Sequence, residues 1–212
     1  MKSTQMEINE WYNTKLEQFG ENDFRSLNWG DKEGKSAKAR YQQMFEHYNW
    51  SDKRIIEVGC GWGSFFDFGF ECKYYYGIDI NPKLVYIANE KYDKEDFVVK
   101  DISKLNSINS RFDIAISSGV AGNRQGPADT PTKLTHYLNF MFNSADNVMI
   151  NFPSNRATIR SEYVEYFAPE YVISQALNIT NNIQLIHKDR SDFLLILKHN
   201  ELRLTRTMRT LK

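Results

Sequence analysis

Three glycines at alternate positions follow an acidic residue at the end of an apolar run, in residues 55–63. The short run of Ile and Val suits a strand that is buried on both faces, as in a parallel sheet. Gly59, Gly61 and Gly63 let the chain turn sharply because glycine has no Cβ. Open α/β sheets bind ligands at the carboxyl ends of their strands, where bare backbone and helix-end N–H groups can face the ligand. The stretch therefore predicts a ligand site with the Glu57 carboxylate beside it.

The position of the third glycine bears on the kind of ligand. A dinucleotide fingerprint reads G-x-G-x-x-G, which would place that glycine at position 64. Position 64 is Ser64, and the glycine comes one residue earlier, at Gly63. A dinucleotide also carries a pyrophosphate, which the Glu57 carboxylate would repel, whereas it would attract a ligand with an ammonium group. These residues disfavour a nicotinamide-dependent oxidoreductase, which stays as one alternative; a glycine-rich turn without a ligand is another.

A second acid stands at the distance expected for a ligand with a ribose. Residues 74–79 predict a second strand that ends in Asp79, which lies 79 − 57 = 22 residues after Glu57. An acid about 20 residues beyond a glycine-rich loop usually accepts hydrogen bonds from the two ribose hydroxyls. The simpler interpretation of Asp79 is a turn residue.

The run Glu-Val-Gly-Cys-Gly-Trp-Gly at residues 57–63 resembles the first motif of the class I S-adenosylmethionine-dependent methyltransferases. The resemblance implies S-adenosylmethionine (SAM) as the cofactor, with the glycine loop around its amino-acid end, Glu57 ordering its amino group and Asp79 binding its ribose. It also implies that Asp101 accepts a hydrogen bond from the adenine amino group and that Ile102 contacts the ring. Asp101 could instead cap a short helix at residues 103–105. The cofactor-binding residues expected from the resemblance are Glu57, Gly59, Cys60, Gly61, Asp79, Ile80, Asp101, Ile102 and Ser117.

The acceptor side of the expected site carries weaker signals. Residues 112–117 predict a fourth strand, after which Ser117, Ser118 and Gly119 would face the transferred methyl group. Methyltransferases that act on nucleic-acid bases or glutamine side chains often carry Asp/Asn-Pro-Pro-Tyr/Phe here, and this chain has Ser-Ser-Gly-Val. The loop at 121–130 should lie above the site, and the aromatic and basic stretch at 154–169 forms either a substrate wall or a surface connection. The expected substrate-binding residues are Arg124, Asp129 and Arg156.

No residue stands out as a catalytic base, so the catalytic residue stays unknown. The candidates are Asp129, His136 and His187, of which His136 is more simply a structural residue of a helix at 131–144. Arg40 is more simply a solvated helix charge, although segments before the first strand often cover the cofactor in the resembling family. Four histidines and two cysteines show no zinc-site spacing, and we expect no metal.

The expected fold class is α/β: a Rossmann-like three-layer sandwich with a mostly parallel seven-stranded sheet. Residues 183–187 and 193–197 predict two strands joined by a tight polar connection, which favours a C-terminal antiparallel hairpin. Two amphipathic helices, at 4–20 and 35–50, precede the first strand. We expect residues 1–50 to form a helical cap of the same domain, residues 51–200 the SAM-dependent methyltransferase domain, and residues 201–212 a basic tail.

Composition narrows the class of partner. The 212 residues suit one α/β domain, and the formal net charge of zero makes nucleic acid an unlikely partner. No apolar run approaches the ~20 residues of a membrane span, and the chain's start lacks the apolar core of a signal peptide. Only two cysteines occur, which favours the cytoplasm. The expected function is methyl transfer to an oxygen or nitrogen of a small molecule, with a non-catalytic subunit of a larger assembly as a further alternative.

Overall fold

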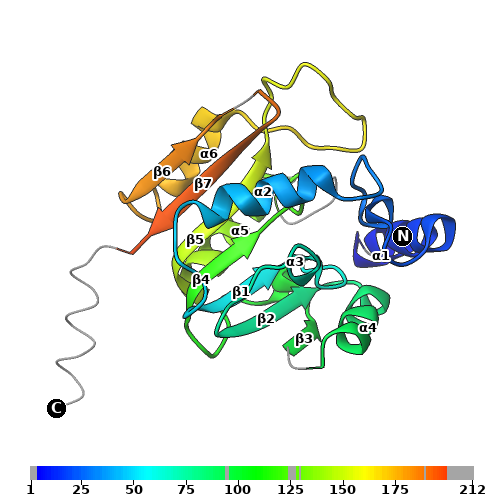
Figure 1. The fold of residues 1–212 in the computed structure, drawn as a ribbon. Coiled ribbons are helices and arrows are strands. Elements are labelled where there is room, and N and C mark those ends of the chain that lie inside the picture. The colour runs from blue at the N-terminus through cyan, green and yellow to red at the C-terminus, as the bar shows by residue number, and fades with distance from the viewer. Residues whose placement is uncertain (1–3, 94–95, 124–127, 129, 189, 200–212) are drawn as a thin grey trace, which may run out of the picture.

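The computed structural model describes residues 4–93, 96–123, 128, 130–188 and 190–199. Its centre is a seven-stranded sheet in the order β3-β2-β1-β4-β5-β7-β6, with helices on both faces (Figure 1). The strands are β1 Arg54–Val58, β2 Tyr74–Asp79, β3 Asp96–Val99, β4 Phe112–Ser117, β5 Ala145–Pro153, β6 Ile183–Ile186 and β7 Asp192–Lys198. The helices are α1 Thr4–Phe19, α2 Lys35–Phe45, α3 Ser64–Asp67, α4 Pro82–Lys91, α5 Pro131–Ser144 and α6 Pro169–Ala176, with short 3₁₀ helices at Phe24–Leu27 and Ile102–Lys104.

The direction of the strands matches the expectation from the sequence. Strands β1 to β5 pair in parallel, whereas β7 runs antiparallel to both β5 and β6. The predicted α/β class, the mostly parallel seven-stranded sheet and the C-terminal antiparallel hairpin are confirmed. The chain leaves β1 in one direction toward β2 and β3, and the strand order reverses at β4. Ligands of open α/β sheets bind at such a reversal point, outside the carboxyl ends of the strands.

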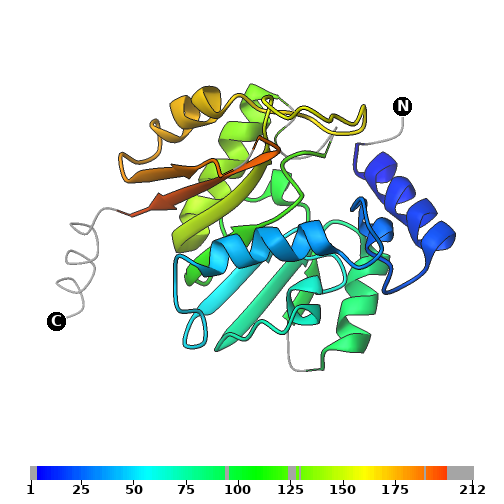
Figure 2. The same ribbon diagram turned by 45° about the horizontal axis from the view of Figure 1, so that its top comes forward.

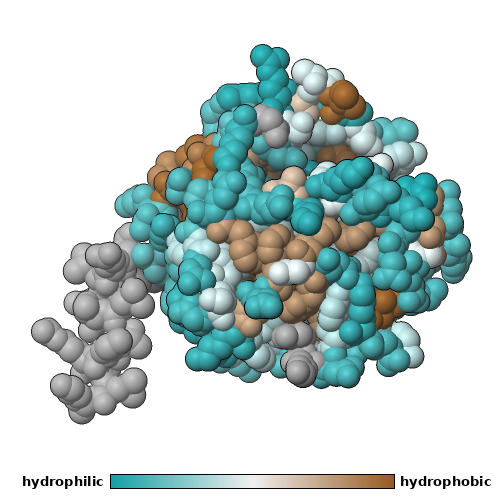
Figure 3. Space-filling view, viewed as in Figure 1, coloured by the Kyte–Doolittle hydropathy of each residue, from teal (hydrophilic) through white to brown (hydrophobic). Residues whose placement is uncertain are grey.

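Two layers of helices cover the sheet (Figure 2). Apolar side chains of α5 and α6, among them Tyr137 and Val172, join the core on one face. Side chains of α2, α3 and α4, among them Met44, Phe65 and Val85, join the core on the other face. On that second face, half-buried phenylalanines reach the surface beneath α2, where apolar surface gathers in the space-filling view (Figure 3). Within the described residues, no helix combines the length and the apolar character that a membrane crossing needs.

One helix ends earlier than expected, and packing also sets the ends of α3 and β5. The helix expected at 35–50 ends at Phe45, because the chain turns and the Trp50 ring stacks on the Phe45 ring with centroids 4.1 Å apart. Helix α3 ends at Asp67, just before Gly69 adopts a φ of 75°. Strand β5 continues to Pro153, because β7 pairs with it that far.

Helix α1 packs at the carboxyl ends of the strands, beside α4 (Figures 1 and 2). The Asn81 side chain, at the start of α4, donates hydrogen bonds to the Asn9 carbonyl (3.4 Å) and to Asn13 Oδ1 (3.2 Å) of α1. The Trp11 ring of α1 lies 5.2 Å from the Tyr163 ring. These contacts bring the N-terminal helix over the edge of the sheet where the site was expected. The domain limits at residues 50 and 200 stay predictions.

Candidate active site

A cavity of about 640 Å³ lies at the carboxyl ends of β1, β2 and β4. This volume falls within the range of small-molecule and cofactor sites, which is roughly 300–1,000 Å³. The cavity brings together residues that the sequence had only placed along the chain. Its lining from the strand ends consists of Gly59, Cys60, Gly61, Asp79, Ile80, Asp101, Ile102, Ser118 and Gly119.

The glycine loop binds the neighbouring strand through its N–H groups. Gly59 and Cys60 donate to the carbonyl of Ile78, at 2.7 and 3.1 Å, and Gly61 donates to Asp79 Oδ2 at 2.9 Å. Gly59 and Gly61 have φ values of 78° and 56°, which disfavour any residue with a Cβ. A Cβ on Gly59 would come within 1.9 Å of the Val120 side chain. The loop therefore faces the cavity with backbone rather than with side chains.

Asp79 joins the glycine loop to the start of α4. Its Oδ2 accepts from the Gly61 N–H, and its Oδ1 accepts from the Asn81 N–H at 2.9 Å. Burial raises the pKa of Asp79, and the N–H groups of Asn81 and Gly61 oppose that rise. Each carboxylate oxygen keeps a further lone pair for a ligand. Asp79 is thus held in place and still able to accept two hydroxyl hydrogen bonds.

Glu57 lies deeper than the sequence predicted. Its side chain is fully buried and does not line the cavity. Tyr41 of α2 donates to Oε1 at 2.5 Å, and Tyr75 of β2 donates to Oε2. Tyr41 lines the cavity and stands between it and the Glu57 carboxylate, so the expected ordering of a ligand's amino group by Glu57 stays a prediction and would act through Tyr41.

The burial of Glu57 makes the stability of the protein depend on pH. Burial raises the pKa of Glu57 from 4.5 to about 7, against the hydrogen bonds from Tyr41 and Tyr75, which lower it. Because the folded protein binds this proton more tightly than the unfolded chain, the stabilisation is complete below pH 4.5 and is lost as the pH rises to about 7. We expect the free energy of unfolding of the ligand-free protein to fall across this window by up to about 1.4 kcal/mol per pH unit through Glu57. Glu57→Gln should remove that part of the slope in urea titrations; equal slopes in the two proteins would contradict it.

Asp101 caps the 3₁₀ helix that follows it, as the alternative interpretation of the sequence had it. Its Oδ1 accepts from the N–H and the hydroxyl of Ser103, at 3.0 and 2.6 Å, and its Oδ2 lies 3.1 Å from Lys104 Nζ. Burial raises the pKa of Asp101, but the bonds from Ser103 and Lys104 outweigh it and lower the pKa overall. The next residue, Ile102, lines the cavity, and its carbonyl lies 2.9 Å from His136 Nε2. His136 therefore has a structural contact at this end of the site.

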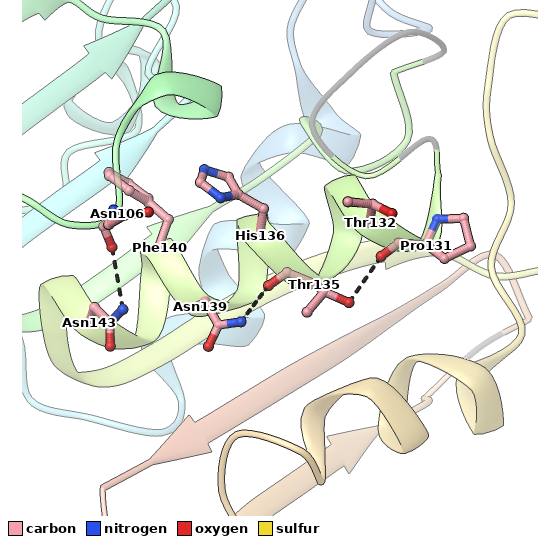
Figure 4. A pocket seen from close by; sticks show the side chains of 8 residues that line it. All are labelled: Asn106, Pro131, Thr132, Thr135, His136, Asn139, Phe140 and Asn143. Carbon is pink, nitrogen blue, oxygen red and sulfur yellow. Dashed lines mark hydrogen bonds between the residues drawn. The ribbon is translucent and has the colours of Figure 1, made fainter.

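A second hollow of about 620 Å³ adjoins the cavity on the surface of α5 (Figure 4). Thr132 and His136 line both spaces. Its two asparagines on α5 use their amide groups locally: Asn139 donates to the Thr135 carbonyl and Asn143 to the Asn106 carbonyl. The hollow is thus the polar outer surface of a helix, and the deeper cavity is the candidate active site.

The two serines after β4 point in different directions. Ser117 donates to the Val58 carbonyl at 2.7 Å and does not line the cavity, so the geometry does not support its expected place in the cofactor site. Ser118 lines the cavity, is buried, and its hydroxyl has no hydrogen-bond partner among the described residues. The alternation of side chains along a strand explains the difference.

None of the acceptor-binding residues expected from the sequence is found in the lining of the cavity among the described residues. Arg124 and Asp129 lie outside the described residues. Arg156 is exposed, pairs with Glu170 and does not line the cavity, which removes it from the candidate site. His187 does not line the cavity either.

Residues from the N-terminal segment form part of the site, and sequence reasoning had missed most of them. Arg40 lines the cavity and makes two hydrogen bonds of 2.9 Å to Asp192, so it is not the solvated charge that we expected. Tyr12, Trp29 and Tyr41 line it as well. The signal available was their aromatic character in segments that precede the first strand.

Comparison with known proteins agrees with this arrangement. A family model described as a methyltransferase domain matches residues 56–133, which contain the glycine loop, Asp79, Asp101 and Ser118. This match confirms that residues 56–133 form a methyltransferase domain, as predicted from the sequence, and SAM is the methyl donor that such a domain uses.

Solved structures share the fold of this methyltransferase at low sequence identity. Magnesium protoporphyrin IX methyltransferase from Synechocystis PCC 6803 with bound SAM is 14% identical with a TM-score of 0.64, over 94% of this chain and 99% of that one. DhpI, solved with S-adenosylhomocysteine, is 10% identical with a TM-score of 0.68, over 95% and 100%. A SAM-dependent methyltransferase from Clostridium acetobutylicum ATCC 824 is 13% identical with a TM-score of 0.61, over 88% and 98%. No protein with curated annotation matches the sequence.

Proposed function

We propose that this methyltransferase transfers the methyl group of SAM to an oxygen or nitrogen atom of a small molecule. The observation that carries the proposal is the cavity at the reversal point, which places Gly61, Asp79, Ile102 and Ser118 around one space. A dinucleotide-binding sheet has the strand order 3-2-1-4-5-6. Here an antiparallel β7 lies between β5 and β6, which argues against the nicotinamide-dependent alternative.

The lining suggests how the cofactor lies. Gly59 and Gly61 run along its amino-acid part, and Tyr41 receives the ammonium group with Glu57 behind it. The Asp79 carboxylate accepts from the ribose hydroxyls. Ile80, Ile102 and Asp101 surround the adenine, with Asp101 free to accept at the cavity side while it caps its helix.

The chemistry is an in-line displacement in which the protein contributes alignment and exclusion of water. The acceptor's lone pair forms the new bond to the methyl carbon as the carbon–sulfur bond breaks, and the electron pair stays on sulfur. The acceptor's proton is released to bulk solvent when the methylated product leaves the cavity. Ile8 and Tyr12 of α1 line the cavity from the side of solvent and help to exclude water from it.

The net charge and the cysteines of the chain are consistent with a small-molecule acceptor and with a place in the cytoplasm. The net charge of zero supplies no electrostatic attraction to nucleic acid. Cys60 and Cys72 form no disulfide bond in the described structure, as is usual in a reducing compartment.

A thermal-shift titration with two ligands tests the proposal. S-adenosylhomocysteine should raise the melting temperature, and the rise should grow with ligand concentration because the ligand binds only the folded protein. NAD should leave the melting temperature unchanged. A shift with NAD alone would favour an oxidoreductase. The absence of any shift would favour a subunit without a cofactor.

Tyr41→Phe tests the placement of the amino-acid part. We expect it to weaken S-adenosylhomocysteine about ten- to a hundredfold, the range for one hydrogen bond to a charged group. It should leave 5′-methylthioadenosine unaffected, because that ligand has the same nucleoside but no ammonium group. Isothermal calorimetry measures both affinities.

Tyr48→Phe is the matched control for Tyr41→Phe. Tyr48 donates to Asn147 Oδ1 at 2.7 Å and does not line the cavity, so both ligands should bind its variant as they bind the wild type. Equal losses for the two ligands in Tyr41→Phe would mean that Tyr41 shapes the fold rather than the ammonium site.

A further inference from the structure

Two buried polar side chains at the ends of β4 and β5 have no hydrogen-bond partner among the described residues. They are the Ser118 hydroxyl and the Asn151 side chain, whose amide nitrogen and oxygen are both unpaired. Ser118 is 6% exposed and Asn151 1%. A buried polar atom without a partner destabilises the fold by about 1–3 kcal/mol, so native proteins rarely keep several together without a ligand or water to satisfy them.

The sheet brings these two residues together. In the parallel pairing of β4 with β5, Ser117 lies opposite Ile150, so the residues that follow each of them come side by side. Ile116 and Met149 belong to the core beneath α2, as does Leu194, the partner of Asn151 on β7. Side chains alternate along a strand, so Ser118 and Asn151 share the face that α2 covers. Ser118 reaches the cavity, and Asn151 stands behind it.

The walls around Ser118 are aromatic and apolar. The Trp29 ring packs over Gly119, where an added Cβ would come within 3.0 Å of it. The guanidinium of Arg40 stacks over Trp29, 4.7 Å from the ring centroid. Val120, Pro153 and Val164 complete this side of the cavity.

The positive charge on this side is already compensated. Arg40 makes a two-point ion pair with Asp192, and both side chains are 20% exposed. An acceptor whose carboxylate lies beside Trp29 would therefore find no unshared charge on Arg40, and burying it there is unfavourable. Lys100 and Lys133 line the same cavity, so this cost applies to the part around Trp29. A neutral acceptor meets no such cost.

From these contacts we propose that the acceptor is a neutral, flat aromatic alcohol whose hydroxyl binds Ser118, with Asn151 as the positioning residue that orients the Ser118 hydroxyl. The inference rests on the proposed function, since it assigns the acceptor of that same site. The Ser118 oxygen accepts the acceptor's O–H, and the Ser118 hydroxyl then turns toward the Asn151 amide, with which it makes no hydrogen bond in the structure. The aromatic ring of the acceptor packs between Trp29 and the apolar wall.

The test uses the full chain saturated with S-adenosylhomocysteine and two probes with the same naphthalene ring, the neutral 2-naphthol and the anionic 2-naphthoate. Calorimetry should show binding of 2-naphthol and at least about tenfold weaker binding of 2-naphthoate. Ser118→Ala should weaken 2-naphthol by about three- to tenfold, the range for one neutral hydrogen bond, with unchanged S-adenosylhomocysteine affinity. Ser144→Ala is the matched control, because Ser144 is equally buried but donates to the Phe140 carbonyl within α5, away from the cavity.

Asn151→Leu separates a positioning role from a structural one. It should weaken 2-naphthol while leaving the melting temperature unchanged or higher, because it removes two unpaired polar atoms. A lower melting temperature with full 2-naphthol affinity would overturn the role of Asn151. Equal binding of the two probes, no binding of 2-naphthol, or full affinity in Ser118→Ala would overturn the acceptor assignment while S-adenosylhomocysteine still binds. If S-adenosylhomocysteine itself does not bind the wild type, the proposed function fails, and the inference with it.

Discussion

Asp79→Ala is expected to weaken the binding of S-adenosylhomocysteine by about ten- to a hundredfold. The carboxylate accepts from the ribose hydroxyls in the proposed complex, and hydrogen bonds to a charged group contribute about 1.5–3 kcal/mol, at about 1.4 kcal/mol per factor of ten. The variant also loses the bond from Gly61 that holds the glycine loop against β2. 5′-Methylthioadenosine carries the same ribose, so its affinity should fall by a similar factor, in contrast to the result expected for Tyr41→Phe.

Two further variants serve as controls for Asp79→Ala, one at the same residue and one at a distant acid. Asp79→Asn keeps one acceptor oxygen and should lose less affinity than Asp79→Ala. Asp113→Ala removes an acid at the opposite end of the sheet, where Asp113 accepts from the Arg54 N–H, so it should lower stability without changing ligand affinity. Calorimetry that finds full affinity in a folded Asp79→Ala protein would refute the ribose site.

Gly61→Val is expected to abolish detectable binding of S-adenosylhomocysteine while the protein still folds. Gly61 lines the cavity, and the two methyl groups of valine would occupy space that the cofactor's amino-acid part needs. Its φ of 56° adds a backbone cost of about 1–2 kcal/mol for a residue with a Cβ. The new Cβ would meet only the tip of the Leu27 side chain, at 3.0 Å, which can shift to make room.

Gly69→Val separates the backbone cost from the loss of space in the cavity. Gly69 has a φ of 75°, but an added Cβ there would meet nothing within 4 Å, and Gly69 does not line the cavity. Its variant should lose a similar amount of stability and keep full affinity. If both variants bind alike in calorimetry, the glycine loop does not contact the cofactor.

Local patterns in the sequence were enough to predict the sheet and the part of the site that contains Gly61 and Asp79. The apolar runs and their lengths predict the strands, and the polar connection at residues 188–192 predicts the antiparallel hairpin that the structure has. Asp79 lines the cavity with Gly61 because both follow parallel strands, whose carboxyl ends meet at the same edge. Such features depend on neighbours in the chain or on the period of a strand, both of which can be seen in the sequence.

Side-chain partners were decided by tertiary structure alone. Glu57 is bonded to Tyr41 and Tyr75 rather than facing a ligand, because a helix and a strand from other parts of the chain pack over it. Arg40 meets Asp192, which is 152 residues away, and so becomes part of the cavity.

The acceptor side shows the same division most clearly. The sequence by itself determined that Ser117 and Ser118 leave β4 at the ligand edge of the sheet. Only the register of β4 against its neighbours decided that Ser117 binds the Val58 carbonyl and Ser118 faces the cavity. The physical reason is that a strand's period of two sends adjacent side chains to opposite faces, and a shift of one residue exchanges them. The packing of α2 on one of those faces then decides which serine faces the cavity.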